Sequence, residues 1–569
     1  MKEIIAKLLK KAFTEKEINL NEKQIESLLE IPPSSELGDY SFPCFSIAGV
    51  LKENPAKIAL EIKKKISSSD FVDSVQSVGS YVNFFLNKEK IAKEIIKNIS
   101  VQKEKFGSSK SPNKEKTMIE FSQANTHKAF HVGHVRGTSI GESLARILEF
   151  GGNRVIRANY QGDSGMHVAK WIWCYKKYHH KEQLKKDESW IASIYVDAIK
   201  RLSQNEKLQE EVDAINRKLS EGKDKSLMAL WKKTRKVSLD SFEKIYKELN
   251  THFDKYFFES QFEKKGKEIA KELIKERIAK VSDKAVIIDL NKYNLGIWVL
   301  LRGDGTVLYS AKDLALAEKK FREFRITKSI YVVGAQQSLH LTQLFKVLEL
   351  MKFKQAKSCT HIPVTEVRLP TGKMSSRTGE NILYSNFMRE IISYSAKEIK
   401  KRFPALPKEE LEKRSLKISI AAIKYSMLKQ SLNKILVFSK EEALNFEGDS
   451  GAYILYSYAR ASSILKKVKK PKKQRTQFKI EKKLENSEFE LVKKLLQFKD
   501  AVKNAYNNMN PSVIANYSYQ LSQLFNEFYH SCPVISSDNE SFRLALVDSF
   551  RQVLKNSLFL LGIETIEEM

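Results

Sequence analysis

Cysteines are few in this chain and lie far apart. The four cysteines among 569 residues form no CxxC pair. A cysteine-based zinc site is therefore not expected, and neither is a disulfide framework, which fits a reducing cytoplasm. Long apolar runs are also missing, since none approaches the length of about 18 residues typical of a membrane helix. Lysines interrupt the opening stretch MKEIIAKLLKKAF, which indicates an amphipathic helix and not a signal peptide.

Acidic residues are the scarcer of the two charged classes. Lys and Arg number 99 against 69 Asp and Glu, a formal net charge of +30. Such an excess favours an anionic partner, of which nucleic acid is the usual one. A lysine-rich composition without a specific partner would give the same excess. With 42% hydrophobic and 30% charged residues the chain is typical of globular proteins, and its length predicts about three or four domains.

Local patterns divide the chain into four regions. The strand-like TMIEF (residues 117–121), then a turn and a helical pattern closed by Gly151 and Gly152, is how nucleotide-binding α/β domains begin. Further strand-like runs occur at 285–290, 297–301 and 330–334. We therefore predict an N-terminal α+β domain over 1–105, an α/β Rossmann-like domain with a parallel sheet over 116–398 and a helical insertion at about 178–280, a helical connector over 399–445, and a C-terminal all-α helical bundle over 446–569.

The motif HVGH, residues 131–134, stands where the first helix of the α/β domain is expected to begin. Two imidazoles at a helix N-terminus suit an anionic ligand, because free backbone N–H groups and the helix dipole point toward it. Gly133 has no Cβ and lets a flat base approach the backbone. The alternative is a pair of surface histidines or of metal-binding histidines. The sequence offers no third ligand for a metal site.

The segment GKMSSRTG, residues 372–379, places a lysine, two hydroxyls and an arginine between glycines. Its Lys and Arg can hold a leaving pyrophosphate, and the glycines permit movement. Taken alone, a basic Gly/Ser loop is more often simply solvated. The pairing of HxGH near the start of a nucleotide-binding domain with KMSS near its end is far more specific, and it resembles the two signatures of class I aminoacyl-tRNA synthetases.

Longer blocks resemble the arginyl-tRNA synthetase family within that class. They are IEFSQANTHKAFHVGHVRGTSIGESLARILEFGGNRV (119–155), LRGDGTVLYSAKDLA (301–315), VVGAQQSLH (332–340) and FEGDSGAYILYSYARASSIL (446–465), with ELGDYSFPCF (36–45), GSYVNFFL (79–86) and the ending LLGIETIEEM. They follow the family's order over nearly the whole chain. The sequence departs from the family's pattern at Thr365-Glu366, where an aromatic–Gly pair is usual, and at Thr378, where a lysine is common. The stretch DSGMHV (163–168) also lacks the tryptophan often found beside its aspartate.

The resemblance implies an arginine–tRNA ligase that activates arginine with ATP, accompanied by Mg²⁺, and transfers it to tRNA(Arg). It implies catalytic His131, His134 and Lys373; an ATP site of these three with Gly133, Met374, Ser375 and Ser376; an arginine site of Glu120, Asn125, Tyr309, Asp313 and Gln337; and tRNA-elbow contacts from Tyr81 and Asn83. Asp313 and Glu120 would face the guanidinium, which needs paired carboxylate acceptors. Without the resemblance, Asp313 would be a helix-end charge and Glu120 a salt-bridged edge residue. Neither a protein-bound zinc nor any other protein metal site is expected, and the protein is expected to be a cytoplasmic monomer with no membrane partner.

Three other functions compete with this interpretation. A class I synthetase for another amino acid would share both signatures, but the paired acids favour a cationic substrate, and the lack of zinc-type cysteines argues against a cysteinyl enzyme. A noncatalytic tRNA-binding relative would have no reason to keep both signatures intact. A smaller HxGH nucleotidylyltransferase would leave the C-terminal helical region unexplained.

Overall fold

The computed structural model describes residues 1–14, 16, 18–67, 69–109, 115–370, 372–373, 383–468 and 478–569. It divides into two compact units. One consists of 1–106, 464–498 and 523–553, and the other of 107–463, 499–522 and 554–569. Within the described part of the chain, none of the helices combines the length and hydropathy needed to cross a membrane.

The N-terminal residues of the first unit form a small α+β fold. An antiparallel sheet has the strand order β1-β3-β2, with β1 at Tyr40–Pro43, β2 at Val72–Val78 and β3 at Tyr81–Leu86. Its helices are α1 (Lys2–Thr14), α2 (Glu22–Leu28), α3 (Phe45–Leu51), α4 (Pro55–Lys65) and α5 (Lys88–Gln102). Strand β3 buries Val82, Phe84 and Leu86 on one face, and Asn83 between them is buried as well.

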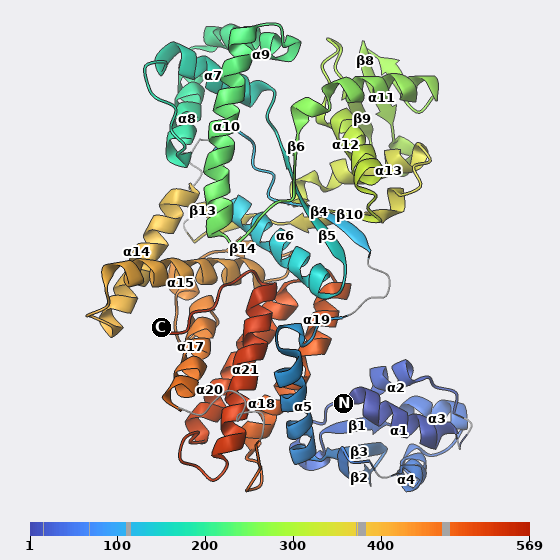
Figure 1. Ribbon diagram of the computed structural model, residues 1–569. Coiled ribbons are helices and arrows are strands. Elements are labelled where there is room, and N and C mark those ends of the chain that lie inside the picture. Colours follow the sequence, from blue (N-terminus) through green and yellow to red (C-terminus); the bar gives the residue numbers. More distant parts are fainter. Residues whose placement is uncertain are drawn as a thin grey trace. The chain divides into compact units, whose positions relative to one another are not determined.

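A five-stranded parallel sheet organises the second unit (Figure 1). Its order is β11-β10-β4-β5-β6, with β4 at Lys116–Glu120, β5 at Arg154–Gln161, β6 at Lys255–Phe258, β10 at Lys328–Gly334 and β11 at Cys359–Val364. The chain builds outward from β4 in one direction through β5 and β6, and in the other through β10 and β11. In such sheets the ligand site lies at the carboxyl ends of the strands, where the order reverses. That point is the junction of β4 and β10.

Helices connect the strands of this unit. They are α6 (Val132–Phe150), α7 (Met166–Tyr178), α8 (Glu188–Gln204), α9 (Gln209–Glu221), α10 (Lys225–Glu248), α11 (Glu263–Lys275), α12 (Tyr309–Phe324) and α13 (Ser338–Leu350). Of these, α6 and α13 pack on the parallel sheet. Helices α7 to α10 share a core of their own that contains four tryptophans. Strand β6 lies within the stretch predicted as a helical insertion, yet it pairs with β5 in the main sheet.

The strand-like runs at 285–290 and 297–301 lie in a separate antiparallel sheet, β7-β8-β9 (Figure 1). These strands are Lys280–Ser282, Ala285–Asp289 and Ile297–Leu301. A third small sheet joins β12 (Val367–Leu369), β13 (Gly372–Lys373) and β14 (Leu436–Val437). The remaining helices are α14 (Tyr384–Arg402), α15 (Lys408–Leu428), α16 (Lys440–Ala443), α17 (Gly451–Lys467), α18 (Asn486–Leu496), α19 (Phe498–Asn507), α20 (Ser512–Ser531) and α21 (Glu540–Leu560). The predicted fold class, an α/β domain with a parallel sheet between an α+β region and a helical region, is confirmed.

Candidate active site

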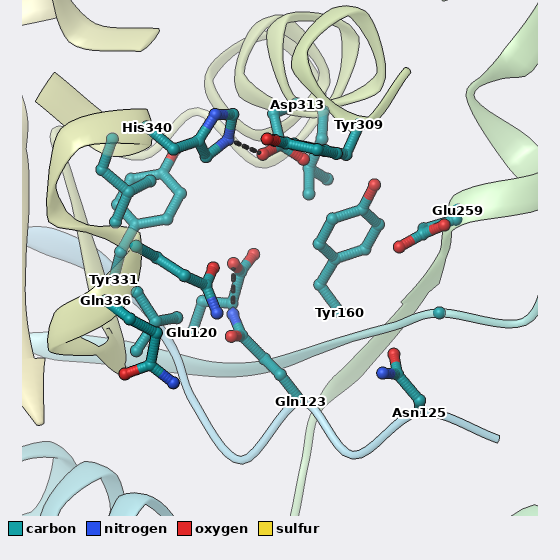
Figure 2. Close-up of a pocket in the computed structure, with 15 residues that line it drawn as sticks. Glu120, Gln123, Asn125, Tyr160, Glu259, Tyr309, Asp313, Tyr331, Gln336 and His340 are labelled. Atoms are coloured by element: carbon teal, nitrogen blue, oxygen red, sulfur yellow. Dashed lines mark hydrogen bonds and ion pairs between the residues drawn. The ribbon is translucent and has the colours of Figure 1, made fainter. Parts of the chain in front are cut away.

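A pocket of about 380 Å³ opens at the carboxyl ends of the parallel strands (Figure 2). Its volume lies within the range of about 300–1,000 Å³ found for small-ligand sites. All five residues predicted to bind arginine line it, although they come from three separate stretches of the chain: the end of β4 with the loop after it, the start of α12, and the turn after β10. Its walls are formed by Glu120, Gln123, Asn125, Tyr160, Gly162, Glu259, Tyr309, Asp313, Leu316, Tyr331, Val333, Gln336, Gln337, His340 and Leu341.

Asp313, in the second turn of α12, is held in one orientation by a chain of hydrogen bonds. The indole N–H of Trp298 donates to His340 Nδ1 at 3.2 Å. Because Nδ1 accepts, the ring's proton lies on Nε2, which donates to Asp313 Oδ2 at 2.6 Å. The other carboxylate oxygen, Oδ1, is buried and has no hydrogen-bond partner among the described residues. One oxygen of Asp313 is thus fixed by the protein, and the other is left for a ligand.

Glu120, at the end of β4, is only 2% exposed and is already paired. Its Oε2 lies 2.5 Å from Nζ of Lys320, which is fully buried on α12. Its Oε1 accepts from Gln123 Nε2 at 2.7 Å. Burial raises the pKa of Glu120, and the Lys320 charge opposes this shift. The carboxylate lines the pocket, but Lys320 neutralises part of its charge from the side of the core.

Glu259 is an acid of the pocket that sequence reasoning missed. It follows β6 directly, and burial raises its pKa. Lys312 lies 3.7 Å from its Oε2. A Cβ on Gly162 would clash with Asn125 Oδ1 and crowd Glu259 Oε1, so glycine leaves the room that these two side chains occupy. The signal that could have found Glu259 was the short apolar run KYFF, whose strand character the charged helical surroundings concealed.

Tyr309 and Gln337 stand at the pocket's open side. Tyr309 begins α12, is 57% exposed, and contacts the His340 ring edge-on with centroids 4.6 Å apart. Gln337 ends the short 3₁₀ helix that follows β10. The four-residue spacing of Tyr309 and Asp313 on one helix places both on the same face, as predicted.

The HVGH histidines stand at the beginning of α6, which Val132 opens. The backbone N–H of His131 donates to His134 Nδ1 at 3.1 Å, and the two rings lie 3.8 Å apart. Burial, and then the charge of Lys128, lowers the pKa of His131 to about 4. Burial also lowers the pKa of His134 well below its usual value. A Cβ on Gly133 would lie 2.9 Å from the His131 ring. Both imidazoles are therefore neutral near pH 7.

Lys128 is a second residue that the sequence did not single out. It stands three residues before His131, and burial lowers its pKa. Its Nζ lies 5.4 Å from the centre of the Tyr195 ring. Its charge helps to lower the pKa of both HVGH histidines. Lys128 therefore supplies positive charge just before α6, where the histidines themselves are neutral.

The second signature is described only at its beginning. The backbone of Gly372 and Lys373 forms β13 and pairs with β12. The side chain of Lys373, and all of Met374, Ser375 and Ser376, lie outside the described residues. Their predicted contacts with ATP therefore stay predictions.

Arg136, two residues after the HVGH motif, connects α6 to the segments around β12 and β14. Its fully buried guanidinium donates to Thr365 Oγ1 at 2.8 Å and to Lys434 O at 3.0 Å. Thr365 Oγ1 in turn bonds to carbonyl oxygens of the same α15–β14 connection. Thr365, which departs from the family's usual residue, is therefore the hydroxyl partner of a buried arginine.

The predicted tRNA-elbow residues lie on β3 of the first unit. Tyr81 is partly exposed and packs edge-on against Phe45, with ring centroids 5.7 Å apart. Asn83 is only 3% exposed, and its Oδ1 accepts from the Ser41 hydroxyl at 2.6 Å. The side chain of Asn83 thus bonds between the paired strands β1 and β3, whereas Tyr81 reaches the surface.

One cluster in the helical insertion brings together side chains of metal-ligand type. Cys174, His179 and Asp197 lie close to one another. Asp197 Oδ2 accepts from His179 Nε2 at 2.9 Å and from Arg201 Nε at 2.7 Å. The Cys174 thiol donates to the same oxygen at 3.4 Å, so the carboxylate oxygen that would bind a cation is already used by three protein donors.

Three family models together match most of the chain. The model described as tRNA synthetases class I (R), catalytic domain, matches residues 95–439. The DALR anticodon binding domain matches 454–569, and the arginyl tRNA synthetase N terminal domain matches 1–86.

Curated relatives and solved structures agree with these matches. An arginine–tRNA ligase of Clostridium perfringens is 37% identical and covers 97% of this chain and 98% of its own length. One of Clostridium acetobutylicum is 35% identical over the full length of both chains. The arginyl-tRNA synthetase of Thermus thermophilus shares the fold at a TM-score of 0.81, with 24% identity and full coverage of both chains. That of Plasmodium falciparum shares it at 0.78, with 22% identity over 99% of this chain and 98% of its own. The predicted family is confirmed, and the chain belongs to the class I arginyl-tRNA synthetases.

Proposed function

We propose that this chain is an arginine–tRNA ligase, which activates L-arginine with MgATP and transfers it to the 3′-terminal adenosine of tRNA(Arg). The observation that carries the proposal is the acidic pocket at the β4–β10 junction, inside the region that the class I (R) family model matches. It combines three carboxylates with amide and hydroxyl groups from five segments. A cationic amino acid supplies the charge and the N–H donors that such a pocket lacks.

Asp313 and Glu259 are the main acceptors for the guanidinium in this proposal. Asp313 keeps one oxygen without a hydrogen-bond partner in the part of the chain that the structure describes, and Glu259 stands on the other side of Tyr160 (Figure 2). Glu120 adds negative potential from the pocket floor, although Lys320 shares its charge. The Tyr309 hydroxyl contributes a further bond at the open side. Asn125 and Gln337 hold the α-amino and carboxylate groups and direct the carboxylate toward ATP.

The start of α6 is where the α-phosphate of ATP binds in this proposal. His134 accepts a backbone N–H at Nδ1, so its proton lies on Nε2 and can be donated to a phosphate oxygen. His131 adds a second imidazole, and Gly133 lets the adenine approach. Lys128 supplies the positive charge that the neutral histidines do not, and Lys373, Met374, Ser375 and Ser376 hold the β and γ phosphates.

The reaction then needs positioning more than covalent help. The arginine carboxylate attacks the α-phosphorus, the bond to the bridging oxygen breaks, and pyrophosphate leaves with Mg²⁺. A ribose hydroxyl of the terminal adenosine next attacks the arginyl-adenylate and releases AMP. The family resemblance assigns this attack to the 2′ position, the anticodon to the C-terminal helices and the tRNA elbow to the N-terminal domain, with Tyr81 and Asn83 as the elbow candidates. We also propose that the enzyme acts as a cytoplasmic monomer, which light scattering of the purified protein tests.

ATP–pyrophosphate exchange with each standard amino acid, with and without tRNA, tests the proposal. Among the standard amino acids, we expect only arginine to support exchange, and we expect it to be incorporated into tRNA(Arg). We also expect exchange to depend on tRNA, as the family resemblance implies. Exchange driven by another amino acid would refute the assigned substrate. Strong arginine exchange without tRNA would refute only the expected order of events.

A further inference from the structure

Tyr160 occupies the middle of the pocket, although nothing in its sequence context marked it. It lies near the end of β5, the strand between β4 and β6 in the sheet. Figure 2 shows its hydroxyl pointing toward the part of α12 that carries Tyr309 and Asp313, with Glu259 to one side of the ring. The rigid sheet therefore places a phenol between the two acids proposed to bind the guanidinium.

Four side-chain atoms of the pocket lining are buried without a hydrogen-bond partner among the described residues: the Tyr160 and Tyr331 hydroxyls, Asp313 Oδ1 and Glu120 Oε2. Glu120 Oε2 has an ion-pair partner in Lys320. Buried polar groups are nearly always hydrogen-bonded, because leaving one unpaired is costly. The Tyr160 hydroxyl on β5 and Asp313 Oδ1 on α12 are two of these atoms, and a ligand in the pocket that bonds to both would satisfy them.

The charges around Tyr160 define what that ligand is. Burial, and then the charges of Asp313, Glu259 and Glu120, raise its pKa well above the usual value, so the phenol stays protonated. A phenol can donate its hydrogen to a carboxylate and still accept a hydrogen bond at its oxygen. The fitting ligand is therefore a cation with several N–H groups directed to different acceptors. A planar guanidinium has this form, whereas the three donors of an ammonium group surround a single nitrogen.

We propose that Tyr160 is a specificity-determining residue of the pocket, whose hydroxyl accepts an N–H of the arginine guanidinium while donating to a neighbouring carboxylate. This inference rests on the proposed function and deepens it. Asp313 on α12, Glu259 after β6 and Tyr160 on β5 then approach the guanidinium from three elements. Acceptors spread in this way favour a guanidinium over the smaller ammonium group of lysine.

The test is Tyr160→Phe, which removes the hydroxyl and keeps the ring. With tRNA(Arg) saturating, we expect KM for arginine to rise about 10- to 100-fold, because a hydrogen bond to a charged group is lost. We expect kcat and KM for ATP to stay near their wild-type values, and the preference for arginine over lysine in pyrophosphate exchange to fall. The matched control is Tyr175→Phe, which removes a hydroxyl that donates to Glu182 O in the helical insertion. It should leave all these values unchanged.

Each other outcome overturns a distinct statement. An unchanged KM for arginine in Tyr160→Phe would show that the hydroxyl does not contact the ligand. Equal losses of arginine and ATP affinity with a lowered melting temperature would show a structural role and overturn the inference as well. If the wild-type enzyme failed to attach arginine to tRNA, the proposed function itself would fail, before any variant is compared.

Discussion

The two ends of the candidate active site handle charge in opposite ways. At the arginine end, three carboxylates line one pocket, and buried or bonded partners such as Lys320 and His340 hold two of them in place. At the start of α6, burial keeps both HVGH histidines neutral. Both ends belong to one unit, so the difference arises from what each side chain packs against.

This contrast explains how one site can bind two oppositely charged substrates. Fixed negative charge selects a cation, and it is tolerated inside the protein because neighbouring groups compensate for part of it. Neutral imidazoles can donate N–H bonds to a phosphate without binding it too tightly for turnover. The positive charge for pyrophosphate must then come from lysines, of which Lys128 is described beside the histidines. Four predictions test this contrast.

The largest effect is expected for Glu120→Gln, which leaves the buried Lys320 charge without its partner. Breaking a buried pair from one side costs about 3–5 kcal/mol, so the free energy of unfolding should fall by that amount in denaturant titrations. The matched control is Glu323→Gln, which breaks the exposed pair with Lys319 on the same helix; its cost should be below about 1 kcal/mol. Equal small losses in both variants would mean that Glu120 is a solvated pocket acid and no counterion of the core.

Asp313→Asn comes next and acts on the substrate. It removes the charge that faces the guanidinium and keeps the side chain's shape. Losing one side of such a pair costs about 2–5 kcal/mol, equivalent to a fall in kcat/KM for arginine of about 30- to 5,000-fold. Citrulline, the uncharged analogue, should lose far less binding, and ATP binding should be spared. Near-normal charging of tRNA by this variant would refute the assigned pocket.

At the phosphate end, Lys373→Ala should lower kcat for adenylation and leave arginine binding nearly unchanged. The cost of losing one contact to charge that develops in the transition state is about 3 kcal/mol. Lys128→Met should likewise lower kcat and leave arginine binding nearly unchanged. Asp313→Asn is expected to do the reverse, since it impairs the use of arginine and spares ATP binding. Single-turnover and steady-state kinetics measure kcat for adenylation and KM for arginine in both variants. A strong rise in KM for arginine with kcat preserved would contradict the role assigned to either lysine.

The smallest effect concerns pH and His131. Its pKa is about 4 in the folded state, against an ordinary value of 6.5. As pH falls below 6.5 the unfolded chain takes up a proton that the folded chain does not, so stability decreases toward pH 4. The slope is at most about 1.4 kcal/mol per pH unit for one histidine. The unfolding free energy of His131→Asn should therefore fall less steeply over this range. If stability fell equally steeply with pH in variant and wild type, the pKa of His131 would be the same in the folded and unfolded chains, and the low folded-state pKa would be wrong.

Much of the fold could be predicted because strand and helix patterns are local. The runs at 117–121 and 330–334 are central strands of the parallel sheet. The runs at 285–290 and 297–301 are strands as well, but they pair antiparallel with each other in another sheet. Alternation and apolar content reveal a strand and not its partner, because pairing is decided through space. For the same reason the four-residue strand β6 was hidden in a charged, helix-rich stretch.

By itself, the sequence determined the family, through the order and spacing of motifs, and it named the five residues that meet in one pocket. Only the tertiary structure decided what each of them contacts. Glu120 meets Lys320, Asp313 meets His340, and Asn83 turns to Ser41 instead of the surface. Glu259 and Tyr160 enter the pocket only when the sheet is assembled. Charge state and hydrogen bonding depend on burial and on neighbours far away in the chain, and residue types and spacing carry no record of either.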